Sequence, residues 1–399
     1  MILVGVSGGI AAYKTCELVR LLVKAGRDVQ VVMTPEGERF VGPTTFAALS
    51  RRPVLTDASA EVFPHLDASG RAELFCIAPA GANTLARLAH GEAPNVLTQS
   101  ALAFAGPLLV APAMNPRMWS ADVTQQNVRA LLARGVELIG PEQGEMAEGE
   151  HGVGRMAEPE QIAGRIEQRL TTLHSLDGRR VLVTAGGTRE PLDAVRYLGN
   201  RSSGRMGIAV ADEAARRGAQ VTLILAAATA APSAPMRTLR VETAEQLRAA
   251  TLAEAGAADM IVMAAAVADY RPATPVEGKR GKSDAAWTIE LEPTADILAE
   301  LGRSRRPDQL LIGFAAEHGQ DAVGRARDKL ERKRADMIVM NDISRTDIGF
   351  DSALNEIVLV TSKEETFVSR RSKQACAAAI LDSVGNQTDA AAVQQRTTV

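Results

Sequence analysis

The sequence predicts an α/β protein with two Rossmann-like three-layer (αβα) domains, each a mainly parallel sheet covered by helices. Three observations support this class. Short continuous apolar runs alternate with helical patterns, aromatic residues make up only 3% of the 399 residues, and the strand–helix rhythm starts twice. Continuous apolar runs of this length are typical of parallel strands buried on both faces.

The two sets of apolar runs define the predicted domains. The expected strands are 1–6, 29–33, 74–78, 107–111 and 136–139, then 181–185, 220–225, 259–264, 310–315, 336–340 and 356–361. Each set opens with a strand that runs into a Gly-Gly turn. We therefore expect one domain over 1–172, a linker at 173–176 and a second domain over 177–384. Residues 385–399 lack an apolar face and are expected to be disordered.

Composition excludes several classes of protein. Lys and Arg number 45 and Asp and Glu 48, and this net charge of −3 argues against a general nucleic-acid binder. No apolar run approaches the ~20 residues that span a bilayer, and Met1 is not followed by a signal-peptide pattern. The three cysteines are too few and too scattered for a disulfide framework or a zinc motif. We expect a cytoplasmic protein that binds neither membranes nor nucleic acids.

The turn after the first strand reads Ser7-Gly8-Gly9 and leads into a helix. Glycines and a small hydroxyl at such a turn let backbone N–H groups approach a phosphate at the positive end of the helix. Taken alone, the motif is equally typical of a tight packing turn. Thr34 and the segments 78–84 and 111–115 follow the next strands, so we expect these loops to form one ligand crevice with the turn.

Several motifs of the first half resemble those of a known enzyme family. The motifs SGGIAAYK, APAGANT, APAMN and GEMAEGEHGVGRM, with the His of FPHLD, are similar to the homo-oligomeric flavin-containing cysteine decarboxylases. With the second half included, residues 1–384 resemble the bacterial bifunctional phosphopantothenoylcysteine decarboxylase/phosphopantothenate–cysteine ligases of coenzyme A synthesis.

This resemblance implies a flavin-dependent decarboxylation in the first half. A flavin oxidises the CH₂–SH carbon of the substrate to a thioaldehyde, so that the carboxylate becomes a β-thioketo acid and leaves as CO₂. His65 is implied as the base for the oxidation, Asn115 as the group that holds the carboxylate, and Met156 as a substrate contact. Read without the family, His65 is a solvated loop residue and Asn115 a cap or turn residue. The implied FMN site consists of Ser7, Gly8, Gly9, Thr34, Ala80, Asn83 and Thr84.

Glu148 stands at the position where the family has a flap cysteine. In the family this cysteine donates a proton when the reduced flavin returns its hydride to the enethiol. A carboxylic acid whose pKa is raised by burial can donate instead, so we expect Glu148 to take this role. Two alternatives stay open: Glu148 is a solvated flap residue, or the domain is an oxidative-only decarboxylase.

The stretch 184–207 opens the second half and is rich in Gly, Ser and Arg. Backbone N–H groups and guanidinium groups both recognise phosphate, which suits a phosphorylated acid as ligand, although an exposed capping loop is the alternative. The resemblance assigns Arg196 and Asn200 to the substrate and the acyl-nucleotide.

A nucleotide site is expected from residues further along the chain. Alanines at 264–266 let a nucleotide lie close to the backbone, and Asp269 can accept ribose hydroxyls. Lys329 and Lys333 share one helical face, which suits a triphosphate, although a salt-bridged helix is the alternative. Lys279 matches the family's catalytic lysine. The implied CTP site consists of Met263, Ala264, Ala265, Asp269, Lys279, Thr294, Ala295, Asp296, Ile297, Phe314, Lys329 and Lys333.

The resemblance implies a two-step ligation. The carboxylate of 4′-phosphopantothenate attacks CTP to give an acyl-cytidylate and pyrophosphate, and L-cysteine then displaces CMP. No dedicated metal cage is visible, so Mg²⁺ is expected to accompany the nucleotide. The product, 4′-phosphopantothenoylcysteine, is the substrate of the first domain, which yields 4′-phosphopantetheine. Trimeric flavin domains and dimeric ligase domains are also implied.

Two interpretations from other classes compete with this one. A non-catalytic flavin-binding regulatory module fits the first domain, but the presence of His65 and Asn115 counts against it. An NAD(P)-dependent reductase fits two Rossmann-like domains, but G-x-G-x-x-G follows neither first strand.

Overall fold

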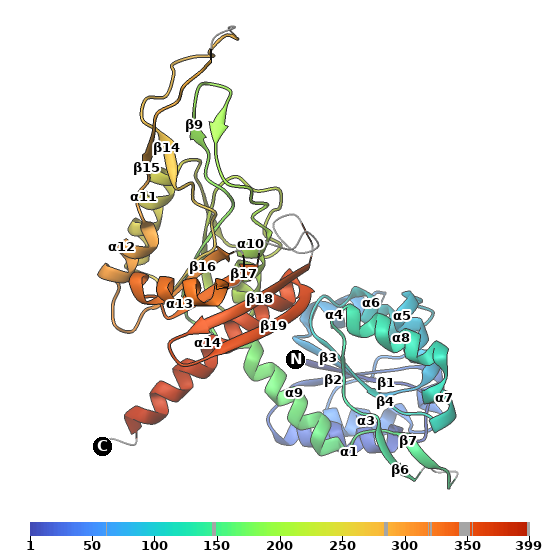
Figure 1. Ribbon diagram of the computed structural model, residues 1–399. Coiled ribbons are helices and arrows are strands. Elements are labelled where there is room, and N and C mark those ends of the chain that lie inside the picture. Colours follow the sequence, from blue (N-terminus) through green and yellow to red (C-terminus); the bar gives the residue numbers. More distant parts are fainter. Residues whose placement is uncertain are drawn as a thin grey trace. The chain divides into compact units, whose positions relative to one another are not determined.

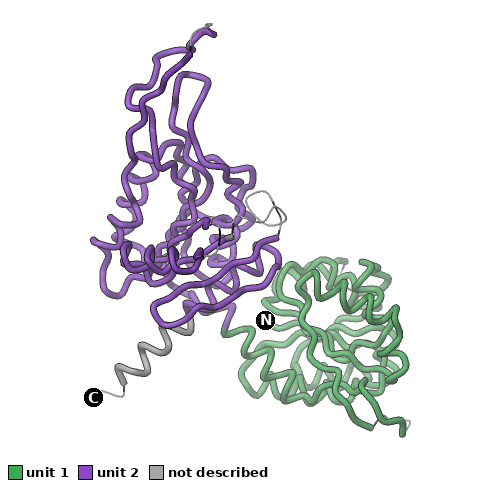
Figure 2. The backbone as a smooth tube through the Cα atoms, in the orientation of Figure 1, with its two compact units in different colours: residues 1–171 green, residues 172–399 purple. Residues whose placement is uncertain are grey.

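The computed structural model describes residues 1–60, 62–145, 149–282, 286–317, 319, 321–342, 352 and 354–396. The chain forms two compact units, Met1–Thr171 and Thr172–Val399 (Figure 2). The division falls next to the linker expected at 173–176. Helix α9 (Pro159–Leu173) ends at this point.

A five-stranded parallel sheet in the order β2-β1-β3-β4-β5 forms the centre of the first unit (Figure 1). Its strands coincide with the five apolar runs of the first half. Every residue of β1, β2 and β3 is buried, as expected for strands covered on both faces. The strands are β1 (Ile2–Val6), β2 (Val29–Met33), β3 (Leu74–Ala80), β4 (Leu108–Pro112) and β5 (Glu137–Leu138).

Helices connect the strands of the first unit. The longest of those between strands, α1, follows the Gly8-Gly9 turn and buries Leu18, Val19 and Leu22, which share one helical face. The helices are α1 (Ala12–Lys24), α2 (Pro35–Glu38), α3 (Pro43–Ser50), α4 (Pro64–Arg71), α5 (Ala82–His90), α6 (Val96–Ala103), α7 (Pro116–Ser120) and α8 (Asp122–Ala133). An antiparallel hairpin of β6 (Glu142–Glu145) and β7 (His151–Arg155) precedes α9, and we call these two strands the flap.

The second unit contains an eight-stranded sheet in the order β12-β11-β8-β13-β16-β17-β18-β19 (Figure 1). The strands from β12 to β17 are parallel, and β18 and β19 are antiparallel. The sequence analysis missed the two edge strands, because an edge strand is less buried and lacks a continuous apolar run. The strands are β8 (Arg180–Ala185), β11 (Gln220–Leu225), β12 (Arg237–Arg240), β13 (Met260–Met263), β16 (Leu310–Glu317), β17 (Met337–Asp342), β18 (Leu354–Thr361) and β19 (Glu365–Ser372).

Two apolar layers cover the two faces of this sheet. Val181 and Val183 of β8 pack in the layer that contains α10 and α14. Leu182, between them, packs in the layer that contains α11, α12 and α13. Because successive side chains point to opposite faces and both faces are covered, every position of the strand is apolar. Burial of each such side chain contributes roughly 1.5–3 kcal/mol to the free energy of folding. The helices are α10 (Arg205–Arg216), α11 (Ala244–Ala255), α12 (Ile297–Ser304), α13 (Ala322–Lys333) and α14 (Lys373–Arg396).

A protruding finger extends from the second unit and was not expected from the sequence (Figure 1). It consists of the hairpin β9 (Glu190–Pro191) and β10 (Tyr197–Leu198), and of the arm that joins β14 (Tyr270–Pro272) to β15 (Leu291–Pro293). Backbone hydrogen bonds from Ala194 to Gly278 and from Val276 to Leu192 hold the two parts together.

Helix α14 runs to Arg396, into the segment 385–399, for which disorder stays a prediction. None of the helices in the described part of the chain has the length and apolar character that crossing a bilayer requires.

Candidate active sites

The carboxyl ends of β1, β2 and β3 carry residues expected to bind flavin. Ser7 is buried, and its Oγ donates a hydrogen bond of 2.8 Å to the carbonyl oxygen of Pro79. The N–H of Gly81 donates to the same Oγ at 3.5 Å, so Ser7 joins the loops after β1 and β3. Thr34 caps α2, since its Oγ1 accepts a hydrogen bond of 3.1 Å from the N–H of Gly37.

The glycines of these loops differ in how much space a side chain would have at each position. A Cβ on Gly8 would lie 2.5 Å from the Cβ of Glu36, so packing against α2 already demands glycine. A Cβ on Gly9 would meet only Pro79 Cγ, at 3.8 Å, and one on Gly81 would meet only two backbone oxygens, at 3.6 and 4.0 Å. Space therefore remains beside Gly9, just before α1, and beside Gly81, just before α5. The N-terminus of α1 beside this space is a position that suits a phosphate group.

Three further residues of the expected flavin site lie around the start of α5. Ala80 ends β3 and is fully buried. Thr84 is buried in the first turn of α5, whereas Asn83 beside it is exposed. The structure thus brings the expected flavin residues to the carboxyl-terminal edge of the sheet, where ligands bind in open α/β folds.

His65 lies in the first turn of α4 and is half-buried. Its ring packs edge-on against Phe63, with 6.4 Å between the ring centroids. Its backbone carbonyl accepts a hydrogen bond of 2.5 Å from Ser69 Oγ. His65 therefore lies on a helix and not in a loop, with a neighbouring aromatic ring beside its imidazole.

Asn115 caps α7 and also contacts the flap. Its Oδ1 accepts a hydrogen bond of 2.9 Å from the N–H of Arg117, and its Nδ2 donates one of 2.6 Å to Glu150 Oε2. Arg117 Nε donates to the other oxygen of Glu150 at 2.9 Å. The Asn115 amide, assisted by Arg117, holds the pKa of the Glu150 carboxyl below its usual range. Asn115 thus already binds a carboxylate, and the sequence analysis overlooked Glu150.

Two glycines let the flap lie directly on the Asn115 loop. The N–H of Met114 donates to the carbonyl of Gly154 at 2.9 Å. A Cβ on Gly154 would overlap the carbonyl oxygen of Met114, and one on Gly152 would lie 2.7 Å from Pro116 Cγ. The Gly-x-Gly of this motif is therefore a packing requirement.

The remaining motif residues concern the base and the tip of the flap. Lys14, from the first motif, forms an ion pair of 3.0 Å with Glu158 just after β7. This hydrogen bond from Lys14 lowers the pKa of the Glu158 carboxyl and anchors the base of the flap to α1. Met156 is buried beside them. Glu148 lies outside the described residues.

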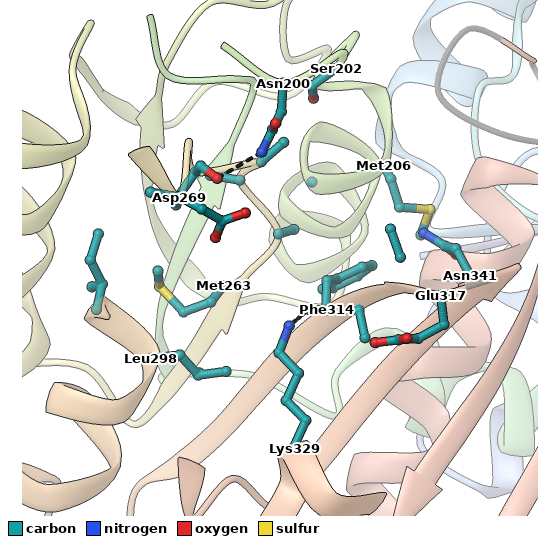
Figure 3. A pocket seen from close by; sticks show the side chains of 18 of the residues that line it. Asn200, Ser202, Met206, Met263, Asp269, Leu298, Phe314, Glu317, Lys329 and Asn341 are labelled. Carbon is teal, nitrogen blue, oxygen red and sulfur yellow. Dashed lines mark hydrogen bonds between the residues drawn. The ribbon is translucent and has the colours of Figure 1, made fainter. Parts of the chain in front are cut away.

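A cavity of about 870 Å³ lies in the second unit (Figure 3). It opens at the carboxyl ends of β13 and β16, between the starts of α10 and α12 and one face of α13. This is the edge of the sheet at which ligands bind in this class of fold. Most of the residues expected to bind nucleotide or acyl-nucleotide line it, namely Asn200, Met263, Ala264, Ala265, Asp269, Thr294, Ala295, Asp296, Ile297, Phe314, Lys329 and Lys333.

The two lysines of α13 are held in different ways. Lys329 Nζ donates a hydrogen bond of 2.8 Å to the carbonyl of Phe314 (Figure 3). Burial lowers the pKa of Lys329, and the carboxylates of Glu317 and Asp269 partly oppose this effect. Lys333 forms an ion pair with Asp296. Both ammonium groups thus belong to one wall of the cavity.

Three polar residues shape the opposite wall. Asn200 Nδ2 donates a hydrogen bond of 2.8 Å to the carbonyl of Val267 (Figure 3). Thr294 donates through Oγ1 to Ala268 at 2.6 Å and through its N–H to the carbonyl of Asp269 at 2.9 Å. The Asp269 carboxylate points into the cavity (Figure 3).

The charge of the cavity favours an anionic ligand. Seven Lys and Arg residues line it, against four Asp and Glu residues. The sequence analysis missed several of these, because α10, β18 and α14 meet here only after folding. Lys373, at the start of α14, is an example, since only 5% of its surface is exposed. The missed lining residues include Ser202, Ser203, Met206, Arg325, Arg332, Asn341, Asn355 and Lys373.

Arg196 and Lys279 are not among the described residues that line the cavity. Both lie on the finger and are exposed. The guanidinium carbons of Arg196 and Arg280 lie 5.5 and 4.8 Å from the ring centroid of Trp287. The described residues contain no cluster of three or more His, Cys, Asp or Glu side chains that could hold a metal ion.

Comparisons with known proteins bear on both units. Residues 1–171 match the Flavoprotein family, and residues 176–387 match the DNA/pantothenate metabolism flavoprotein C-terminal domain. The Coenzyme A biosynthesis bifunctional protein CoaBC of Bacillus subtilis is 41% identical over 365 residues, which cover 90% of this chain and 89% of that protein.

The protein of the same name from Mycobacterium tuberculosis is 42% identical over 400 residues, covering 96% of each chain. The crystal structure of the C-terminal domain of CoaBC covers 54% of this chain and 98% of that chain, with 35% identity and a TM-score of 0.46. At 41–42% identity over nearly the whole length, the chain belongs to the family of coenzyme A biosynthesis bifunctional proteins.

Proposed function

We propose that the chain catalyses two steps of coenzyme A synthesis. The second unit ligates L-cysteine to 4′-phosphopantothenate with CTP, and the first unit decarboxylates the product, 4′-phosphopantothenoylcysteine, with FMN. The observation that supports this most is the cationic cavity of the second unit, with Asp269, Lys329 and Lys333 around one space.

In the ligation, the substrate carboxylate attacks the α-phosphate of CTP, and the bond to pyrophosphate breaks. Lys329 and Lys333 neutralise the triphosphate, which carries Mg²⁺, and Asp269 accepts hydrogen bonds from the ribose. Lys279 stabilises the charge that develops during this attack. The amine of cysteine then attacks the acyl carbon, loses a proton and displaces CMP, while Asn200 and Arg196 hold the acyl intermediate.

The first unit has the features that a flavin site needs. The spaces beside Gly9 and Gly81 and the positive end of α1 fit a planar ring system with a phosphate. When bound, the flavin supplies the two-electron oxidation of the CH₂–SH carbon that makes loss of CO₂ possible. His65 accepts the proton of the substrate thiol in this oxidation, and Asn115 binds the carboxylate through Nδ2. The flap excludes water.

The test is to purify the protein, record its flavin spectrum and supply CTP, 4′-phosphopantothenate and cysteine. We expect release of FMN on denaturation, and formation of pyrophosphate, CMP and CO₂. Absence of pyrophosphate release, or equal efficiency with ATP, would overturn the assignment of the second unit.

His65→Asn serves as the variant that separates the two reactions. It should keep FMN and ligation but lose decarboxylation by at least ~10², because a group that transfers a proton is removed. Release of CO₂ at the wild-type rate by this variant would contradict the role of His65.

A further inference from the structure

Asp193 lies inside the finger and connects its two parts. Its side chain is fully buried, although it belongs to an otherwise exposed turn between β9 and β10. Its Oδ1 accepts hydrogen bonds from the N–H groups of Val195 (2.8 Å) and Arg196 (2.7 Å) within its own hairpin. Its Oδ2 accepts one from the N–H of Arg280, at 3.3 Å, in the other arm. One carboxylate therefore joins residues that are 87 positions apart in sequence.

The same two segments meet through Arg196. Its guanidinium forms an ion pair of 3.3 Å with Asp193 Oδ2 and donates a hydrogen bond of 3.3 Å to the carbonyl of Arg280. Arg196 and Arg280 also flank the ring of Trp287. Arg280 directly follows Lys279, so these contacts act on the backbone that carries the lysine.

We propose that Asp193 is a positioning residue for the ligation, which fixes the Lys279 segment against Arg196. The inference rests on the proposed function, because it takes Lys279 as the group that stabilises charge and Arg196 as a substrate contact. Lys279 itself is exposed, and the hydrogen bond from Ala194 to the carbonyl of Gly278 ties its segment to the hairpin before the lysine, so fixing the segment on both sides requires a second tie after the lysine, at Arg280. Asp193 supplies this constraint from the buried side of the finger.

The carboxylate is chemically suited to this task. Its two oxygens accept the backbone N–H bonds of Val195, Arg196 and Arg280. The N–H groups of Val195 and Arg196 lower the pKa of this carboxyl, so it is ionised near neutral pH. An asparagine at this position offers only one acceptor oxygen. When this oxygen serves the Val195 and Arg196 turn, the NH₂ group faces the N–H of Arg280 and the Arg196 guanidinium, and these contacts are lost. Asp193→Asn should therefore preserve the hairpin turn but release the Lys279 segment.

The experiment is a double-mutant cycle on pyrophosphate release from CTP and 4′-phosphopantothenate. It uses the full-length wild type, Asp193→Asn, Lys279→Gln and the double variant. We expect Asp193→Asn alone to lower kcat about 10-fold or more and to raise the KM for 4′-phosphopantothenate, since misplacement of a catalytic group is costly. The KM for CTP should stay unchanged, because Asp193 does not contribute to the cavity. In the Lys279→Gln background, the same substitution should change kcat less than about 2-fold.

Asp259→Asn is the matched control. Asp259 likewise accepts a backbone N–H, that of Arg180 at 2.8 Å, and pairs with Arg180 and Arg306, but it lies at the amino ends of the strands. Its variant should ligate normally. Decarboxylation of supplied 4′-phosphopantothenoylcysteine, which the first unit performs, should be normal in every variant.

The outcomes separate the inference from the proposed function. The positioning role would be overturned if Asp193→Asn had wild-type kinetics, or if it lowered kcat equally with Lys279 and with Gln at position 279. The proposed role of Lys279 would still stand in that case, provided that Lys279→Gln slows pyrophosphate release. A raised KM for CTP would also overturn it, because the substitution would then disturb the whole unit. If Lys279→Gln itself releases pyrophosphate at the wild-type rate, the proposed role of Lys279 fails and the inference falls with it.

Discussion

The amide of Asn115 donates a hydrogen bond of 2.6 Å to the carboxylate of Glu150, which lies immediately before the flap strand β7. The same amide is the group that we propose to bind the carboxylate of the substrate. Glu150 therefore competes with the substrate carboxylate for the N–H groups of this amide.

Glu150→Ala should lower the KM for 4′-phosphopantothenoylcysteine. Removing Glu150 leaves the Asn115 amide to the substrate alone, but Glu150 is partly exposed, so we expect a several-fold change at most. Initial rates of CO₂ release measure it. Glu150→Gln, which keeps an acceptor oxygen without the charge, should fall between the variant and the wild type. A higher KM in the alanine variant would show that Glu150 supports Asn115 instead.

Gly154→Ala should weaken the contact between the flap and the Asn115 loop, because the new methyl group overlaps the carbonyl oxygen of Met114. We expect slower decarboxylation with unchanged ligation, measured as CO₂ and pyrophosphate release. Gly164→Ala in α9 is the control, since its Cβ meets nothing within 4 Å and the change should stabilise the helix by about 0.5–1 kcal/mol. Equal decarboxylation by both variants would contradict the packing role of Gly154.

Lys329→Arg should change how the KM for CTP depends on pH. Burial lowers the pKa of Lys329, so the wild type loses this positive charge at a lower pH than an ordinary lysine does. Its affinity for CTP is complete below that pKa and declines as the pH rises through it. A guanidinium stays charged, so the arginine variant should show a flatter profile at alkaline pH. Parallel profiles for the two proteins would exclude Lys329 as the titrating group.

Glu148→Gln tests the proton donor that we predict in place of the family's cysteine. The variant should accumulate a product lighter than 4′-phosphopantetheine by one H₂, together with bleached flavin, because the reductive step lacks its acid. Product mass and flavin absorbance, followed together, provide the measurement. Fully reduced product at the wild-type rate would assign the step to another donor. If the wild type itself accumulates the lighter product, the oxidative-only alternative is correct.

Parallel strands and their loop ends were predictable from the sequence. The apolar runs at 1–6 and 181–185 became central strands because both of their faces are buried, which leaves a continuous signal. Residues at or just after the carboxyl ends of such strands, such as Met263 and Asp269, meet at one edge for topological reasons. Local sequence patterns were therefore sufficient for much of the cavity.

Contacts between distant polar segments were not predictable in this way. Glu150 and Asp193 are acidic residues in polar loops, a pattern that is typical of solvated positions. Their importance depends on Asn115 and Arg280, which approach them only in the folded chain. Lys373 is similar, since its burial follows from the return of β19 and α14 to the sheet.

The edges of the eight-stranded sheet bear on how the protein avoids aggregation by edge-to-edge strand pairing. Unpaired strand edges are templates for aggregation, and natural sheets blunt them with short strands and charge. At one edge β12 is only four residues long, begins and ends with arginine, and is tied to α11 by the ion pair of Arg237 with Glu254. At the other edge β19 buries only Val368 and carries Glu365, Arg370 and Arg371. The apolar parallel strands between them are thereby shielded from pairing with the strands of another chain. The two strands that provide this protection, β12 and β19, are the ones without a continuous apolar run in the sequence.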